Sequence, residues 1–388
     1  MPDHGDTYQH QNRTHMQATL DSFRDAVRHA TETRTPLRLR GGGSKDFYGQ
    51  AMDGQLLDTR AYRGIVEYDP AELVITARCG TPLAEIEAAL AEKRQMLAFE
   101  PPHFAAPGQP SAATFGGAVA AGLSGPRRQS AGALRDFVLG AQMMDGQGEV
   151  MNFGGQVMKN VAGYDVSRLL AGSLGTLGLI LEVSVKVLPT PFDDATLRFE
   201  MSQAEAIDRL NQWGGQPLPI AASAWHEGVL HVRLSGAAAA VRAARARLGG
   251  EAVGPDDGLA FWQSLREQTH AFFAPSLQGR ALWRLAVPPT SAPLDLPGSQ
   301  LVEWGGGQRW WLPEAGAGAG AGPDGNHAGL VRGIAQAVGG HATLFRNGDK
   351  SVGVFTPLAS PLAAIHTRLK ASFDPAGIFN PQRMYPGL

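Results

Sequence analysis

The sequence predicts an α+β protein of two or three domains, and three observations support this fold class. The chain has 388 residues, more than one domain usually contains, and its apolar fraction of 43% can supply a core in each domain. Segments of strand-like alternation are mixed with segments of helical periodicity. Two glycine-rich loops stand in strand-and-turn surroundings. Together these features favour a packed globular protein over a disordered chain.

The elements of the first half are predicted from periodicity and turn residues. Residues 17–33 show helical periodicity, with an apolar face made of Leu20, Phe23, Val27 and Ala30. Strands are expected at Leu37–Arg40, Ile65–Tyr68, Leu73–Arg78, Asp136–Met144, Glu149–Phe153 and Gly178–Leu188. Further helices are expected at Pro82–Lys93 and Val166–Ala171. Thr81 is the predicted N-cap of the first of these, with Glu85 completing a capping box, and Asp145-Gly146 is the turn of a hairpin.

The composition changes near Pro189, and a second α+β region is expected beyond it. Its predicted strands are Thr196–Glu200, Ser223–Trp225 and Val229–Leu234, and its predicted helices are Gln203–Trp213 and Ala237–Leu248. Residues 315–323 form an Ala/Gly-rich stretch typical of a flexible loop. A last helix is expected at Leu362–Phe373.

The two glycine-rich loops are the main functional signal. The first, Arg40-Gly41-Gly42-Gly43-Ser44-Lys45, directly follows a predicted strand. Successive glycines let backbone N–H groups point into one small volume, which suits a phosphate. The second loop runs from Pro107 through Thr114, Gly116 and Gly117 to Gly122 and Gly125. Two such loops favour a dinucleotide held along its length, although neither matches the GxGxxG or P-loop pattern. Alone, the first loop fits a flexible turn equally well.

Composition and charge exclude several other classes. A net charge of −2 gives no basic footprint for nucleic acid. The single cysteine, Cys79, excludes an intrachain disulfide and a cysteine-held metal or iron–sulfur cluster, and it lies in a predicted strand, where a buried structural thiol is expected. There is no secretory signal and no apolar run of membrane-spanning length. A soluble, cytoplasmic protein without a bound metal is therefore expected.

Five segments in register carry a resemblance to a known family: residues 40–49, 114–128, 135–150, 159–180 and 374–381. In this order they resemble the PCMH-type FAD-binding flavoproteins, which include vanillyl-alcohol oxidase and D-lactate dehydrogenase-like enzymes. Within that family the whole chain is most similar to the FAD-binding subunits of bacterial glycolate oxidase. The resemblance implies a PCMH-type FAD-binding domain at 1–190, made of two α+β subdomains split near 100. It further implies a short α+β cap domain at 191–345 and a C-terminal segment, 346–388, that packs back onto the flavin.

The resemblance also implies which residues hold the FAD. The phosphates and ribose would lie at Arg40, Gly41, Gly42, Gly43, Ser44 and Lys45, and the central part at Pro107, Thr114, Gly116, Gly117, Gly122 and Gly125. The turn near the flavin would comprise Gly172, Ser173, Gly175 and Thr176, and the adenine end would lie at Gly178 and Ile180. Asn380 would close on the isoalloxazine. The resemblance also places one further segment near the cofactor, with Lys159, Asn160 and Tyr164. The alternative interpretation is that these residues are a surface lysine, a turn residue and a core tyrosine without a role in binding FAD.

The chain departs from this family pattern in two ways. Ser44 stands where some members carry a histidine that binds FAD covalently, so non-covalent FAD is expected. The histidine-rich motif that supplies a metal site and a general base in hydroxyacid-oxidising relatives is missing. One segment, Asp324-Gly325-Asn326-His327, matches this motif in part and lacks its partner histidines. The catalytic residues therefore stay unknown.

Other polar and aromatic residues leave alternatives open. His226 and His231 fit two strands of one hairpin, as surface or satisfied histidines. Arg127 and Arg128 could attract a carboxylate or form a solvated loop pair, and the role of His341 stays open. Three tryptophans form an aromatic group that fits a core or an interface better than a cofactor site: Trp304, Trp310 and Trp311.

The implied function is that of an FAD-binding subunit of a multi-subunit glycolate oxidase or dehydrogenase, which oxidises glycolate to glyoxylate. The implied partners are a larger FAD-containing hydroxyacid dehydrogenase subunit and an iron–sulfur subunit, with a quinone-type electron acceptor. This chain would not oxidise glycolate alone, and its partners could hold it at the inner face of the cell membrane. The alternatives are a free-standing FAD-dependent hydroxyacid or alcohol oxidoreductase, and an assembly subunit whose flavin site is vestigial.

Overall fold

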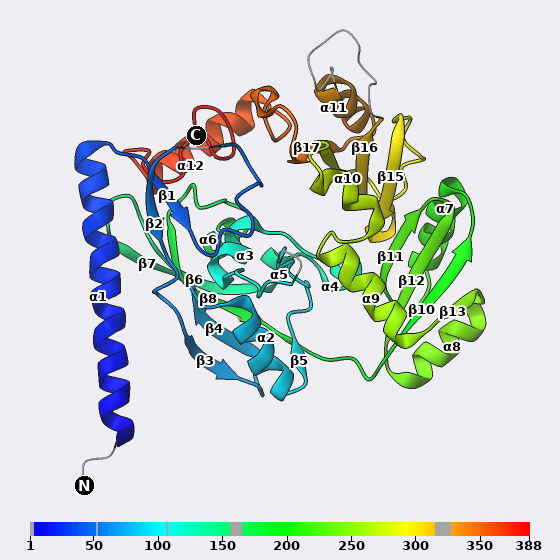
Figure 1. Cartoon of the computed structure of the whole chain (residues 1–388), viewed down its shortest axis with the longest axis horizontal. Coiled ribbons are helices and arrows are strands. Elements are labelled where there is room, and N and C mark those ends of the chain that lie inside the picture. Colours follow the sequence, from blue (N-terminus) through cyan, green and yellow to red (C-terminus); the bar gives the residue numbers. More distant parts are fainter. Residues whose placement is uncertain (1–3, 52, 106–107, 156–164, 315–326) are drawn as a thin grey trace.

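A computed structural model describes residues 4–51, 53–105, 108–155, 165–314 and 327–388. Figure 1 shows two lobes side by side, each built around its own sheet, with a long helix along the outer edge of one lobe. Both sheets are antiparallel, and helices pack against them, as expected for an α+β fold.

The sheet of the first lobe has five strands in the order β3-β4-β8-β6-β7. Their bounds are Ile65–Asp69 for β3, Val74–Arg78 for β4, Val138–Met144 for β6, Val150–Gly154 for β7 and Leu179–Lys186 for β8. Two small pairs accompany the sheet: β1 (Leu37–Arg40) with β2 (Gln55–Asp58), and β5 (Gln95–Met96) with β9 (Leu188–Pro189). The predicted strands of this half and the hairpin at 145–146 are confirmed.

The helices of the first lobe are α1 (His4–Thr33), α2 (Leu83–Glu92), α3 (Phe115–Ala121), α4 (Arg128–Ala131), α5 (Leu134–Phe137) and α6 (Val166–Leu169). The prediction that Thr81 caps α2 is wrong, because Pro82 occupies the N-cap position without a side-chain hydrogen bond. The Thr81 hydroxyl instead accepts from the Gly64 N–H at 2.9 Å. Helix α1 also begins earlier than predicted, because its first residues lack the apolar periodicity on which the prediction depended.

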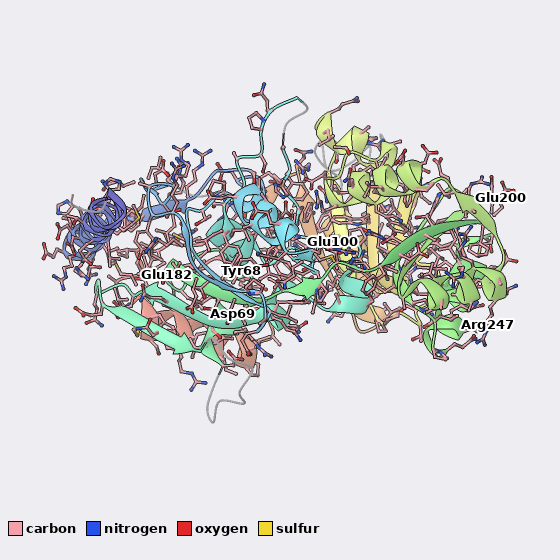
Figure 2. All side chains as sticks on the ribbon, turned by 90° about the horizontal axis from the view of Figure 1, so that it is seen from below. Tyr68, Asp69, Glu100, Glu182, Glu200 and Arg247 are labelled. Carbon is pink, nitrogen blue, oxygen red and sulfur yellow. The ribbon has the colours of Figure 1, made fainter. Side chains whose placement is uncertain are left out.

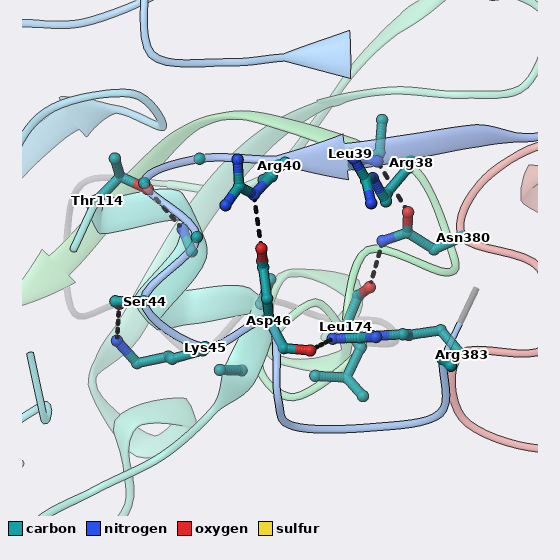
Figure 3. Close-up of a pocket in the computed structure, with 17 residues that line it drawn as sticks. Arg38, Leu39, Arg40, Ser44, Lys45, Asp46, Thr114, Leu174, Asn380 and Arg383 are labelled. Carbon is teal, nitrogen blue, oxygen red and sulfur yellow. Dashed lines mark hydrogen bonds and ion pairs between the residues drawn. The ribbon is translucent and has the colours of Figure 1, made fainter. Parts of the chain in front are cut away.

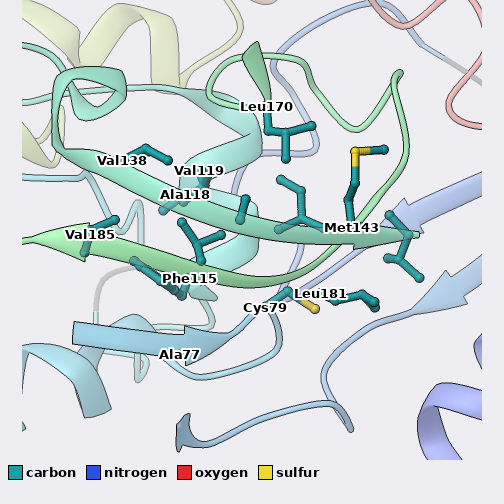
Figure 4. Close-up of a cluster of buried hydrophobic side chains, with 14 of the residues drawn as sticks. Ala77, Cys79, Phe115, Ala118, Val119, Val138, Met143, Leu170, Leu181 and Val185 are labelled. Atoms are coloured by element: carbon teal, nitrogen blue, oxygen red, sulfur yellow. The ribbon is translucent and has the colours of Figure 1, made fainter. Parts of the chain in front are cut away.

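The core of this lobe lies where α3 packs on the five-stranded sheet, as Figure 4 shows. Phe115 and Val119 of α3 meet Val185 of β8 in this cluster, and all three are buried. Cys79 belongs to the same cluster, and burial raises the pKa of its thiol to about 12. The prediction of a buried structural thiol is therefore confirmed.

The sheet of the second lobe has eight strands in the order β13-β10-β12-β11-β15-β16-β14-β17. Their bounds are Asp193–Glu200 (β10), Ile220–His226 (β11), Val229–Gly236 (β12), Glu251–Val253 (β13), Leu282–Ala286 (β14), Gly298–Glu303 (β15), Gln308–Pro313 (β16) and His341–Arg346 (β17). The three predicted strands are confirmed as parts of β10, β11 and β12. The strands from β13 onward were not predicted from the sequence.

The remaining helices cover or follow this sheet. They are α7 (Gln203–Gly214), α8 (Ala238–Leu248), α9 (Pro255–Arg266), α10 (Ala274–Leu277), α11 (His327–Ala337) and α12 (Ser360–Phe373), with single turns at Ala271–Phe273 (η1), Trp304–Gly306 (η2) and Lys350–Val352 (η3). A full capping box explains the start of α7, because Ser202 and Glu205 exchange hydrogen bonds.

After α12 the chain returns to the first lobe and pairs with its first strand. The Leu37 N–H donates to the Ile378 carbonyl at 2.7 Å, and the Asn380 N–H donates to the Leu37 carbonyl at 3.0 Å. These two bonds hold the end of the chain against β1 and bring Asn380 beside the first glycine-rich loop.

Candidate functional site

A cavity lies where the first glycine-rich loop, α3 and the returning C-terminal segment meet. Its volume is about 300 Å³, which lies within the range of small-molecule sites. Figure 3 shows β1 and the loop after it on one side, with Asn380 and Arg383 on another. A smaller pocket shares Leu39, Leu174 and Asn380 with it and extends toward Ile180. The two pockets together connect the first glycine-rich loop with Ile180 at the start of β8.

Most of the predicted site residues line these two pockets. Those that do are Arg40, Gly41, Gly42, Gly43, Ser44, Lys45, Thr114, Gly116, Gly117, Gly175, Gly178, Ile180 and Asn380. Five others do not line them: Gly122, Gly125, Gly172, Ser173 and Thr176. Pro107, Lys159, Asn160 and Tyr164 lie outside the described residues.

The residues beside the pockets shape their walls. Gly122 is the C-cap of α3 in the left-handed conformation, with the backbone of Gly172 packed against it. The Ser173 hydroxyl donates to the Leu170 carbonyl at 2.9 Å, and the Thr176 hydroxyl donates to the Ser173 carbonyl at 2.8 Å. These contacts build the turn that presents Leu174 to the cavity. Gly125 lines a different cavity, at the second lobe.

The first loop needs glycine for close approach as well as for conformation. A Cβ on Gly42 would lie 1.4 Å from the backbone oxygen of Ala112, which no side chain could tolerate. Gly43 has a φ of +75°, in the region that glycine adopts without strain. The second loop is less loop-like than predicted, because α3 begins at Phe115. Thr114 is its N-cap and accepts from the Gly117 N–H at 3.3 Å.

Asn380 acts as a clamp across the cavity. Its Oδ1 accepts from the Leu39 N–H at 2.8 Å, and its Nδ2 donates to the Leu174 carbonyl at 2.6 Å. Behind it, the buried Lys370 ammonium donates to the Phe379 carbonyl at 2.8 Å and pairs with Asp374 at 2.6 Å. The side chain of Asn380 is therefore held in place by backbone groups from two separate parts of the chain.

Positive charge dominates the cavity lining. Its cationic members are Arg38, Arg40, Lys45 and Arg383, whereas Asp46 is the acidic residue that lines it. Asp46 pairs with Arg40 at 2.7 Å. The Arg38 Nε is buried and has no hydrogen-bond partner among the described residues. An unsatisfied buried donor in a cationic cradle fits a phosphate or pyrophosphate, because such a ligand would supply the missing acceptors.

Two arginines line the cavity but were not among the predicted site residues: Arg38 and Arg383. Arg38 could have been found, because residues two apart on a strand face the same side and Arg40 had already been selected. Arg383 has no comparable signal. It reaches the site through tertiary contacts with the carbonyls of Gln50 and Asp46.

Lys45 is the most perturbed cation of the site. Burial lowers the pKa of its ammonium to about 8, and the charge of Glu267 partly offsets this. The Lys45 Nζ lies 3.2 Å from the Ser44 Oγ and 5.5 Å from the centroid of the Phe104 ring. The ammonium is thus available to an anionic ligand near neutral pH.

The other candidate residues lie away from this cavity. His226 and His231 occupy the two strands of the β11–β12 hairpin, as predicted, and burial lowers the pKa of both. Of the Asp324–His327 segment, only His327 is described, at the start of α11. The described residues include no group of three or more His, Cys, Asp or Glu side chains that could hold a metal ion.

Arg127 departs from both earlier interpretations, because it is neither solvated nor free for a substrate. It is 6% exposed and pairs with Glu100 at 3.3 Å and Asp194 at 3.2 Å. Arg128 stacks on Trp304, with its guanidinium carbon 4.3 Å from the ring centroid. Trp310 and Trp311 are buried in the second lobe, which confirms that they are core residues.

Comparison with known proteins agrees with the geometry. A family model described as an FAD binding domain matches residues 17–154. The glycolate oxidase subunit GlcE of Escherichia coli (strain K12) is 48% identical over 364 residues, which are 94% of this chain and 97% of that protein. The glycolate oxidase subunit GlcD of Bacillus subtilis (strain 168) is 32% identical over 43% of this chain and 35% of its own length.

Two further comparisons are informative. The D-lactate dehydrogenase of Archaeoglobus fulgidus is 31% identical over 50% of this chain and 43% of its own length. A solved structure of alkyldihydroxyacetonephosphate synthase matches with a TM-score of 0.62 and 14% identity, over 92% of this chain and 74% of that one. At that identity the likeness shows the fold, and it confirms the predicted PCMH-type architecture. Among the described residues, no helix is long and apolar enough to cross a membrane.

Proposed function

Because this chain belongs to the family of the FAD-binding glycolate oxidase subunit GlcE, we propose that it is an FAD-carrying subunit of a multi-subunit glycolate oxidase. The observation that carries this proposal is the cationic cavity between the two glycine-rich loops, with the unsatisfied Arg38 Nε in its wall. Bound FAD supplies the redox chemistry, as an acceptor of hydride and a donor of single electrons.

The residues of the chain would hold FAD in a fixed position. Arg38, Arg40 and Lys45 would neutralise the pyrophosphate, and the backbone of Gly41–Gly43 would approach it closely. Asn380 and Leu174 would border the flavin end, and Ile180 the adenine end. Ser44 lines the cavity with a hydroxyl, which forms no bond to flavin of the kind that a histidine can form. FAD is therefore proposed to bind non-covalently.

The proposed partners follow from what this chain lacks. With one cysteine, the chain cannot hold an iron–sulfur cluster through its own thiolates, so a separate iron–sulfur subunit would carry the electrons onward to a quinone-type acceptor. The histidine-rich motif of hydroxyacid-oxidising relatives is missing, so a larger FAD-containing subunit would oxidise glycolate to glyoxylate. The complex would lie in the cytoplasm or at the inner face of the membrane.

An absorbance spectrum of the purified chain tests the cofactor part of the proposal. Flavin bands that remain in the supernatant after acid precipitation are expected, because no covalent bond should retain the cofactor. A correctly folded chain without flavin would contradict the proposal and favour an assembly role.

Anaerobic addition of glycolate tests the division of labour. The flavin band of the isolated chain is expected to persist, and to bleach only after the partner subunits are added. Bleaching in the chain alone would instead identify a free-standing oxidoreductase.

A further inference from the structure

The chain segment that leads toward the second glycine-rich loop is held by a carboxylate of the second lobe. Glu267 is the C-cap of α9. Its Oε2 accepts two hydrogen bonds from the backbone of the first lobe, from the His103 N–H at 3.0 Å and from the Phe104 N–H at 2.8 Å. Its Oε1 accepts from the Arg266 Nε at 2.7 Å. One half-buried side chain therefore joins the two lobes through main-chain bonds.

Phe104 has a backbone conformation that a bulky residue rarely adopts. Its φ is +52°, in the left-handed region. Such a conformation costs free energy and persists where surrounding contacts impose it. Here Glu267 binds the Phe104 N–H, and the aromatic ring lies near cations from both lobes. The Lys45 Nζ is 5.5 Å from the ring centroid, and the Arg346 guanidinium carbon is 5.7 Å from it. The ring thus connects the first glycine-rich loop with the end of β17.

The charge of Glu267 also acts on Lys45, which Figure 3 shows in the loop after β1. Burial lowers the pKa of the Lys45 ammonium to about 8, and the negative charge of Glu267 opposes this shift. The other charged groups nearby are Arg346, which shares the aromatic contact, and Asp46, which pairs with Arg40 at 2.7 Å. Without Glu267, a larger fraction of the Lys45 side chains would be neutral near pH 8.

A second route leads from the same segment to the first glycine-rich loop. The His103 side chain is buried, with its Nδ1 2.7 Å from the Ser111 Oγ and its Nε2 2.9 Å from the Glu87 Oε2. These contacts hold Ser111 in place. The next residue, Ala112, has the carbonyl oxygen against which Gly42 packs so closely that no Cβ would fit. Both glycine-rich loops are therefore positioned in part by the segment that Glu267 binds.

We propose that Glu267 is a positioning residue for FAD, through which the second lobe sets the geometry and the charge of the first glycine-rich loop. Glu267 does not line either pocket of the proposed FAD cavity, so it acts through Phe104, His103 and Lys45. This role rests on the proposed function for the identity of the ligand. It goes beyond that function, because it makes cofactor binding depend on contact between the lobes.

Two substitutions separate the effect of position from the effect of charge. Glu267→Ala removes the acceptor of both backbone N–H groups, so the affinity for FAD at about pH 6.5 should fall about tenfold. Glu267→Gln keeps an acceptor oxygen and removes the charge, so its affinity at that pH should stay within about threefold of the wild type. The pH at which affinity begins to decline, about 8 in the wild type, should be lower in Glu267→Gln. Fluorescence titration with FAD measures these changes.

Two measurements on the flavin-free chain test the same role without the cofactor. Hydrogen exchange should be slow at the His103 and Phe104 amides in the wild type and in Glu267→Gln, and faster in Glu267→Ala. Acetylation of Lys45 by acetic anhydride follows its neutral fraction, and the side chain is reachable because it lines the cavity. The midpoint of the acetylation rate, about pH 8 in the wild type, should be lower in Glu267→Gln.

Asp257→Asn is the matched control, because it removes an exposed carboxylate in the first turn of the same helix. It should leave the FAD affinity and the Lys45 midpoint unchanged, and circular dichroism confirms that each variant folds. Wild-type affinity in Glu267→Ala, or an unchanged Lys45 midpoint in Glu267→Gln, would overturn the positioning role and leave the proposed function intact. A wild-type chain that binds no FAD would contradict the proposed function, and the positioning role with it.

Discussion

Two groups of arginines in this molecule differ in what neutralises them. At the proposed FAD cavity, Arg38 is half-buried and its Nε is buried without a hydrogen-bond partner among the described residues, and the glycine loop beside it offers backbone N–H groups. At the junction of the lobes, Arg127 and Arg233 share two carboxylates, those of Glu100 and Asp194. Figure 2 shows Glu100 where the two lobes meet. In the proposed function FAD would complete the hydrogen bonds of Arg38, whereas the protein itself neutralises Arg127 and Arg233.

This difference separates a binding site from a structural joint. In the joint, Arg233 donates to Asp194 at 2.8 Å and to Glu100 at 2.9 Å, so charges from both lobes cancel within one network. Buried charges are tolerated when they are paired in this way. The sequence alone does not distinguish an arginine that binds a ligand from one that pairs with a carboxylate of the protein, because the partner is set by the tertiary structure.

The largest effect is expected from a substitution in the first glycine-rich loop, at the proposed FAD cavity. In Gly42→Ala, the new Cβ would lie 1.4 Å from the Ala112 carbonyl oxygen, so the loop must move away from the pyrophosphate. We expect the variant to fold and to retain no flavin, as measured by absorbance after gel filtration. Gly333→Ala, on α11 with open space around its Cβ, is the control and should keep its flavin. Normal flavin content in Gly42→Ala would show that the loop does not hold the cofactor.

The next largest effect should come from the joint. Arg127→Met leaves Glu100 and Asp194 with a single arginine. Because Asp194 is exposed and solvent screens its charge, the loss should cost about 1–3 kcal/mol in the free energy of unfolding. Urea denaturation followed by circular dichroism measures this change. Flavin content at low temperature should stay normal, since Arg127 does not line the FAD cavity. The control is Arg135→Met, at an exposed arginine. If both variants had the same unfolding midpoint, the network would contribute no more to stability than a surface ion pair.

Arg38→Met should not lower the free energy of unfolding, in contrast to Arg127→Met. Loss of this half-buried cation should leave the free energy of unfolding of the flavin-free chain unchanged or raise it, because its buried Nε has no hydrogen-bond partner among the described residues. The affinity for FAD should fall about tenfold, which corresponds to one charge-assisted hydrogen bond. Fluorescence titration with FAD measures the affinity. Arg60→Met, next to Asp58 on the surface, is the control. A destabilised flavin-free variant would mean that Arg38 has a structural partner.

The smallest effect concerns Lys45, whose pKa burial lowers to about 8. Because this folded pKa lies below the ordinary value, the flavin-free chain should gain stability as pH rises from about 8 toward 10.5. Over the same rise Lys45 loses its charge, so the affinity for FAD should decline several-fold. Lys45→Met should flatten both profiles. Identical profiles in the variant and the wild type would show that another group titrates.

The part of the fold that the sequence revealed is the part with regular alternation. Strands β8 and β10 lie in such segments, in which polar residues recur at every second position. Strand β16 does not, because all six of its residues are buried and no polar face marks its period. Thr81 was misassigned because a threonine before a proline resembles an N-cap, whereas its hydroxyl is bound to a distant backbone group.

The candidate site was predictable where local chemistry defines it. The glycines of the first loop and Thr114 are conspicuous, because close approach and capping depend on neighbouring residues. Arg383 was not predicted, because only the return of the chain end brings it to the cavity.

The clamp made by Asn380 has a consequence for biosynthesis. Its side chain binds the backbone of Leu39, which is 341 residues earlier in the chain. The cavity can therefore be completed only after residue 380 has left the ribosome. Cofactor loading must follow translation, and any chain that stops short of the clamp would lack a finished site. The returning segment therefore makes the finished cavity depend on synthesis of the chain through residue 380.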